Sequence, residues 1–163
     1  MLAPDAPRAP ADPLDAALAR CGRHLGRRDH SVAELRARLE RDGLAAAVID
    51  DAVALLCAQG YLDDRRYARQ LVEDRRTIDG WGRERIRARL EAAGIDAELI
   101  EEALAGVDPA EELAAATELV RRRCSPPLAS DRERQRAFTL LVRQGFDCDL
   151  AYDAVRAASA HDD

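Results

Sequence analysis

The chain has 163 residues, of which 47% are hydrophobic and 4% aromatic, and its formal net charge is −6. This acidic balance argues against a protein that coats nucleic acid by bulk electrostatic attraction. All 25 basic residues are arginine, so every cation is a planar guanidinium that can grip a carboxylate or phosphate with two hydrogen bonds. The longest apolar run, residues 52–58, is too short to span a bilayer.

The first segment of the chain, residues 1–12, is rich in Ala and Pro and lacks the basic start and apolar core of a signal peptide. It predicts a disordered N-terminal tail, and residues 159–163 predict a short C-terminal tail. The four cysteines lie far apart without a C-x-x-C pair. This spacing indicates buried, reduced thiols in a cytoplasmic protein.

Helix start signals follow in chain order. An aspartate before proline places an N-cap acceptor ahead of a residue suited to the first helical position, and this occurs at Asp12 and Asp108. Asp63 stands 51 residues after Asp12 and predicts a similar cap. A serine followed three residues later by glutamate predicts a capping box at Ser31 and Ser130. The predicted helices are 13–25, 32–42, 45–58, 64–77, 83–93, 96–105, 109–123, 131–144 and 147–158.

Three glycines mark an internal repeat. Gly43, Gly94 and Gly145 stand 51 residues apart, each where a helix end needs left-handed backbone, and a leucine lies four residues before each of them. A fixed period with matched apolar positions is typical of a repeat architecture. We therefore predict an all-α protein of three tandem three-helix, helix-turn-helix-like repeats in an elongated array, straight or curved. The predicted repeats are residues 13–60, 61–107 and 108–158, with Pro126-Pro127 breaking the third.

The last helix of each predicted repeat is acidic. In a DNA-reading helix-turn-helix motif this helix enters the major groove with basic or amide side chains. Residues 45–58, 95–105 and 146–155 contain no arginine, and phosphate repels their carboxylates. This composition disfavours sequence readout. The carboxylates are Asp50, Asp51, Asp96, Glu98, Glu101, Glu102, Asp147, Asp149 and Asp153.

The arginines gather instead on the first and second predicted helices. Arg36 and Arg38 are the 51-residue counterparts of Arg87 and Arg89, which predicts a shared basic contact face on the first two repeats. A merely solvated or internally paired set of charges is the alternative. Trp81, between two glycines, is either a loop anchor or an exposed contact residue. The predicted partner-binding residues are Arg36, Arg38, Arg65, Arg66, Arg69, Arg83, Arg85, Arg87, Arg89 and Trp81.

Motifs for catalysis are scarce. Asp63 and Asp64 are adjacent, so their side chains diverge from a helix, and helix capping explains them better than an acid–base pair. The chain has no glycine-rich phosphate loop, no Ser-His-Asp ordering and only three histidines. The sequence therefore predicts no catalytic residue, metal, cofactor or small-molecule substrate, and a protein that is not an enzyme. A helical-repeat adaptor and a helix-turn-helix DNA-binding regulator remain alternatives, although common two-helix repeats are only about 34 to 47 residues long.

Three ordered sets of residues resemble a known family. They are residues 31–35 with Gly43, residues 60–64 with Tyr67 and Ala68, and residues 80–82 with Ile86, Leu90 and residues 94–95. Together with residues 145–146, they make the chain similar to the bacterial regulatory RecX family over about residues 13–156. The central set is the most specific and the third repeat the least.

The resemblance implies a function that spacing alone does not give. RecX proteins are cytoplasmic, non-enzymatic modulators of the RecA recombinase, built from three tandem three-helix units. They lie along the RecA filament on single-stranded DNA and inhibit its extension, ATPase, recombinase and coprotease activities. The resemblance thus implies a monomer that contacts the filament, with weak or indirect DNA contact and no membrane. The basic face would meet an acidic filament surface or nearby DNA, while the acidic third helices would face elsewhere or meet basic filament loops.

Overall fold

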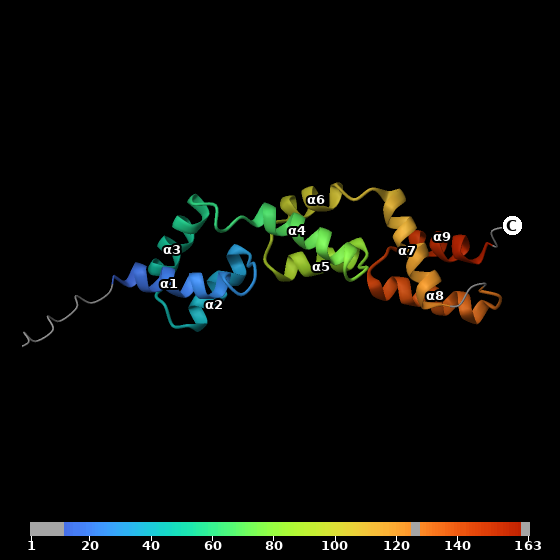
Figure 1. Ribbon diagram of the computed structural model, residues 1–163, viewed down its shortest axis with the longest axis horizontal. Helices are drawn as coiled ribbons and strands as arrows, with labels where there is room; N and C mark the ends of the chain where they lie inside the picture. Colours follow the sequence, from blue (N-terminus) through green and yellow to red (C-terminus); the bar gives the residue numbers. More distant parts are fainter. Residues whose placement is uncertain (1–11, 125–127, 161–163) are drawn as a thin grey trace, which may run out of the picture. The chain divides into compact units, whose positions relative to one another are not determined.

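The computed structural model describes residues 12–124 and 128–160, which form nine α-helices and no β-strand (Figure 1). Residues 1–11, Pro126-Pro127 and residues 161–163, where the sequence predicts tails and a break, lie outside the described residues. Each helix lies within one residue of its predicted bounds. The helices are α1 Pro13–Leu25, α2 Val32–Arg41, α3 Ala46–Ala58, α4 Asp64–Thr77, α5 Arg83–Ala92, α6 Ala97–Ala105, α7 Pro109–Arg123, α8 Asp131–Gln144 and α9 Cys148–Ser159.

The predicted caps explain why the helices begin where they do. The side chain of Asp12 accepts a hydrogen bond from Leu14 N at 3.1 Å, and that of Asp108 accepts one from Ala110 N at 2.8 Å. Ser130 forms a complete capping box, in which its hydroxyl and the carboxylate of Glu133 each satisfy the other's backbone N–H. These bonds satisfy N–H groups that have no partner within the helix.

The predicted glycine turns are confirmed by their backbone angles. The φ angles of Gly43, Gly94 and Gly145 are 80°, 72° and 90°. A side chain at such an angle crowds the following carbonyl, and glycine avoids this cost. Each glycine lets the second helix of a repeat end and the third begin within a few residues.

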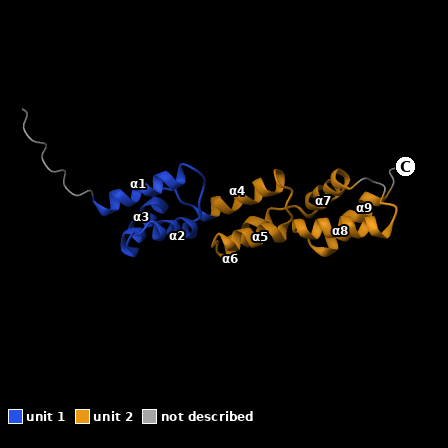
Figure 2. Cartoon of the chain, turned by 90° about the horizontal axis from the view of Figure 1, so that it is seen from below, with its two compact units in different colours: residues 1–64 blue, residues 65–163 orange. Residues whose placement is uncertain are grey.

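The chain forms two compact units, residues 1–64 and residues 65–163 (Figure 2). The first unit contains one hydrophobic core, which α1, α2 and α3 build around Leu35, Leu39 and Ile49. The second unit contains two cores. One belongs to α4, α5 and α6, and the other, around Leu141 and Phe146, belongs to α7, α8 and α9.

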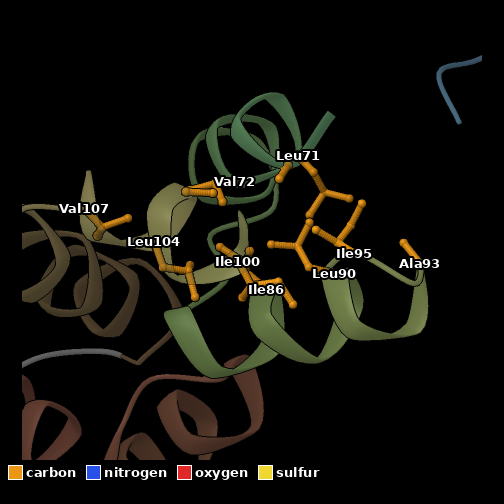
Figure 3. Packing of buried hydrophobic residues seen from close by; sticks show 11 residues of the cluster. Leu71, Val72, Ile86, Leu90, Ala93, Ile95, Ile100, Leu104 and Val107 are labelled. Atoms are coloured by element: carbon orange, nitrogen blue, oxygen red, sulfur yellow. The ribbon is translucent and has the colours of Figure 1, made fainter. Parts of the chain in front are cut away.

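Figure 3 shows how one of these cores is assembled. Val72 from α4, Ile86 and Leu90 from α5, and Ile100 and Leu104 from α6 bring their side chains together between the three helices. Apolar residues three and four positions apart share one helix face, so each short helix buries one stripe. The stripes of three helices together enclose a small core.

Cysteine exposure differs from the prediction of buried thiols. Cys21 is buried in the core of the first unit, whereas Cys57 and Cys148 are exposed and Cys124 is intermediate. The last turn of α3 and the first turn of α9 carry the two exposed thiols, because the apolar stripes of these helices face the other way. Within the described residues, no helix is long and apolar enough to cross a lipid bilayer.

Candidate partner-binding surface

Two ion pairs recur at the repeat period. Arg36 of α2 binds Asp50 of α3 at 2.5 Å, and Arg87 of α5 binds Glu101 of α6. Arg87 and Glu101 stand 51 residues after Arg36 and Asp50. In each of the first two repeats, a guanidinium on the second helix therefore bonds a carboxylate on the third helix.

A third carboxylate, that of Glu102, binds two arginines of α4. Glu102 of α6 accepts a hydrogen bond from Arg65 Nε at 2.9 Å and another from Arg69. The adjacent carboxylates of Glu101 and Glu102 thus bring arginines of α4 and α5 to the same helix. Carboxylates of α3 and α6 are therefore ion-pair partners of arginines on the first and second helices of their own repeats.

The hydrogen bonds of this cluster set its protonation. The hydrogen bond from Arg87 holds the pKa of the Glu101 carboxyl below its usual range, and the same bond raises the pKa of Arg87. Both groups are therefore charged at neutral pH. The pair is partly exposed, with 28% of the Arg87 side chain and 61% of the Glu101 side chain accessible. Exposed ion pairs add little to stability, so a partner's carboxylate or phosphate can replace Glu101 at small cost.

Two of the predicted contact residues, Arg83 and Arg85, bond residues of the third repeat, and Trp81 lies beside Arg85. The backbone N–H of Arg83 donates to the buried carboxylate of Glu112 on α7 at 3.0 Å, and its guanidinium donates to Leu104 O at 3.2 Å. Arg85 donates to Gln144 Oε1 of α8 at 2.7 Å and lies 4.1 Å from the centre of the Trp81 ring. Trp81 packs against the core of α4–α6, which favours its role as a loop anchor.

A carboxylate also reaches the start of α2. The N–H of Val32, the 51-residue counterpart of Arg83, donates to Asp64 Oδ1 at 2.8 Å. Asp64 therefore has a capping role, as the sequence predicts, although the helix that it caps is α2. The same kind of bond from Glu112 caps α5. A negative charge at a helix N-terminus is stabilised by the helix dipole as well as by the hydrogen bond.

The other predicted residues lie on the same helices. Arg66 on α4 is exposed, while Arg38 on α2 and Arg89 on α5 are partly buried. Arg66 and Arg89 each have an interaction partner within the chain. Among the described residues, no group of three or more His, Cys, Asp or Glu side chains is arranged to hold a metal ion.

The third repeat carries a feature that the sequence reasoning missed. Phe138 and Tyr152 stand 51 residues after Arg87 and Glu101, so an aromatic pair occupies the register of the ion pair. Both line a groove of about 620 Å³ between α8 and α9, and Tyr152 is 65% exposed. The signal in the sequence is the 51-residue register itself, which leads from Arg87 and Glu101 to these two aromatic residues.

Family models match two parts of the chain. The model of the first three-helix domain of RecX matches residues 17–56, and the model of the second three-helix domain matches residues 63–104. These matches cover α2, α4 and α5 completely and most of α1, α3 and α6. The ion-pair clusters described above lie within the matched residues.

Relatives and solved structures match most of the chain. Regulatory protein RecX of Mycobacterium leprae is 37% identical over 77% of this chain and 75% of the relative. That of Mycolicibacterium vanbaalenii is 35% identical over 90% of this chain and 84% of the relative. The crystal structure of RecX from Lactobacillus salivarius superimposes with a TM-score of 0.79, at 18% identity, over 91% of this chain and 98% of that chain. A second crystal structure of a regulatory protein RecX, at 23% identity, gives 0.76 over 90% of this chain and 73% of that chain. These structures share the fold.

Proposed function

This chain belongs to the RecX family of regulatory proteins, and on that premise we propose that it binds RecA filaments on single-stranded DNA and inhibits them. The inhibited activities are filament extension, ATP hydrolysis, recombination and coprotease action. The observation that carries the proposal is sequence identity of 34–37% to several regulatory RecX proteins over three quarters or more of the chain. Because the regulator acts by occupying the filament, it needs no catalytic residue or cofactor. RecA filaments form in the cytoplasm, where we place this protein as a monomer.

The charged clusters of α2–α3 and α4–α6 are the proposed contact surfaces. Their guanidinium groups are partly or fully exposed and already oriented by carboxylates on the third helices. Orientation by a neighbouring carboxylate lowers the entropy that a long side chain loses on binding. A filament carboxylate or phosphate that displaces Glu101 or Glu102 therefore meets an arginine that is already in place. Arg83 and Arg85 support the α4–α6 cluster by bonding α5 to residues of the third repeat.

The direct experiment measures ATP hydrolysis by the cognate RecA on single-stranded DNA while this protein is titrated. We expect inhibition by the wild-type protein. Inhibition at ratios far below one per RecA monomer indicates a block of extension, whereas inhibition only near equal ratios indicates occupation along the filament. If folded protein at equal ratio leaves hydrolysis unchanged, the proposed function is wrong.

A charge swap separates contact from folding. Arg87→Glu places a carboxylate beside Glu101 and Glu84, so it removes both the cation and the ion pair. Adding Glu101→Arg restores the ion pair with its charges exchanged. We expect the single variant and the swap both to inhibit RecA weakly, because a filament contact needs the cation at position 87.

The double variant also defines the result that would contradict a contact role for Arg87. If the double variant inhibits as well as the wild type, the ion pair matters for folding alone and Arg87 is no contact. The same exchange at Arg36 and Asp50 serves as the matched pair in the first repeat. Circular dichroism checks that every variant keeps its helices.

A further inference from the structure

The surface of α8 carries a row of arginines that no carboxylate neutralises. Arg132, Arg136 and Arg143 are exposed, and the structure gives none of them an ion-pair partner within the described residues. They are four and seven residues apart, which places them on one face of the helix at intervals of about 6 Å and 10 Å along its axis. A shallow hollow lined by Gln135, Arg136, Thr139, Leu140 and Arg143 runs along this face.

The two carboxylates of α8 are bonded to groups other than these three arginines. The carboxylate of Glu133 is turned to the backbone N–H of Ser130 in the capping box, and this hydrogen bond lowers the pKa of Glu133. Asp131 binds Arg134 at 2.6 Å on the neighbouring face of the helix. The row therefore stays cationic although the whole chain is acidic.

An aromatic groove adjoins the row. It lies between α8 and α9, which pack side by side (Figure 1), and Phe138, Tyr152 and Val155 form its apolar part. Its two arginines, Arg134 and Arg156, are each paired with an aspartate of their own helix. The groove is thus nearly neutral. Gln135 lines both the groove and the hollow beside the arginine row, so the two features border each other at this side chain.

We propose that this surface of the third repeat binds single-stranded nucleic acid, with phosphates along the row of Arg132, Arg136 and Arg143 and a base against Tyr152. Sites for single strands combine a cationic track for the backbone with aromatic side chains on which bases stack. A duplex keeps its bases stacked inside, so the exposed tyrosine ring favours a single strand. An acidic protein segment would use the arginines, but its carboxylates would not be attracted to the negative face of the tyrosine ring.

The repeat register supports the assignment. In the second repeat the position of Tyr152 is Glu101 and that of Phe138 is Arg87, and the two form an ion pair. A site for a base needs an apolar platform, and only the third repeat offers one at this register. The inference does not rest on the proposed regulation of RecA, and it is tested without RecA, so either can fail alone.

Binding of a fluorescent oligothymidylate to the full chain tests the proposal by fluorescence anisotropy at several salt concentrations. We expect binding that weakens with salt. Arg132, Arg136 and Arg143 changed together to Ala should lower the slope of log K against log salt by about 2, since each phosphate contact on a single strand contributes about 0.7. Tyr152→Ala should weaken binding at least about fivefold and leave the slope unchanged.

The matched control changes Arg23, Arg27 and Arg41 of the first unit to Ala, which removes the same net charge. It should leave oligothymidylate binding unchanged. The proposal is overturned if the oligonucleotide does not bind, or if the triple variant on α8 binds like the control variant. Displacement of the oligonucleotide by a poly-glutamate peptide at equal charge concentration would assign the surface to acidic protein instead. If Tyr152→Ala binds the oligonucleotide as tightly as the wild type, no base stacks on Tyr152 and that part of the proposal is wrong.

Discussion

The contact between the second and third repeats depends on a glycine at position 82. Gly82 N donates to Gln144 O and Glu84 N donates to Gly145 O, both at 2.9 Å. These bonds join the start of α5 to the turn after α8. A Cβ atom added at Gly82 would lie 2.4 Å from the carbonyl of Gly145 and from Phe146 N. Because these are backbone atoms, no side-chain rotation relieves the overlap.

The cost of Gly82→Ala follows from this geometry. Restoring ordinary contact requires a shift of about 1 Å, which stretches both hydrogen bonds out of range. Each bond contributes about 1 kcal/mol net, and the disturbed packing adds up to about 1 kcal/mol more. Gly82 has a φ of −79°, so alanine adds no backbone strain. We expect the second unit to lose about 2–3 kcal/mol.

Urea denaturation followed by Trp81 fluorescence measures this loss, and hydrogen exchange reports the amides of Gly82 and Glu84 directly. Gly22→Ala is the control, because a Cβ there meets no atom within 4 Å and alanine favours a helix interior by about 0.5–1 kcal/mol. An unchanged urea midpoint for Gly82→Ala, with both amides still protected, would refute the close-contact argument.

Three further outcomes follow from single side chains. Ser130→Ala removes the capping box and should cost the second unit about 1 kcal/mol in urea denaturation. The low pKa of Glu133 comes from that box, so its contribution is present above about pH 4.3 and is lost as pH falls through the folded-state pKa; Ser130→Ala should flatten this acid dependence. Burial and then the charge of Arg28 lower the pKa of His30. Below about pH 6.5, His30 therefore binds a proton more readily in the unfolded chain than in the folded chain, which lowers the free energy of unfolding of the first unit. The protection factors of the α1–α3 amides in hydrogen exchange should fall there in the wild type, and fall less in His30→Phe.

The helices could be predicted closely because their signals are local. A proline after Asp108 and a serine three residues before Glu133 fix where α7 and α8 begin, and these signals act within one turn. The left-handed glycines likewise end the second helices through their own backbone. Such features need no knowledge of the rest of the chain.

The pairing of charges could not be predicted in the same way. Arg65 and Glu102 are 37 residues apart, and Arg85 and Gln144 are 59 residues apart. Only packing brings them together, so counting arginines on α4 and α5 gave a more basic surface than the structure has. The repeat offered one usable signal, because arginine and carboxylate recur together at 36 and 50 and at 87 and 101.

The divergence of the third repeat links these observations. Where the first two repeats pair an arginine with a carboxylate, the third exposes Tyr152 beside Phe138. Oriented guanidinium groups suit exchange with a protein's carboxylates, whereas an aromatic platform beside free arginines suits bases and phosphates. In the second unit, the backbone hydrogen bonds at Gly82 and Gly145 join the repeat that carries the α4–α6 cluster to the repeat that carries the aromatic groove. Binding at one surface then raises the effective concentration at the other, so loosening the glycine contact should weaken joint binding to a filament more than binding of the oligonucleotide alone.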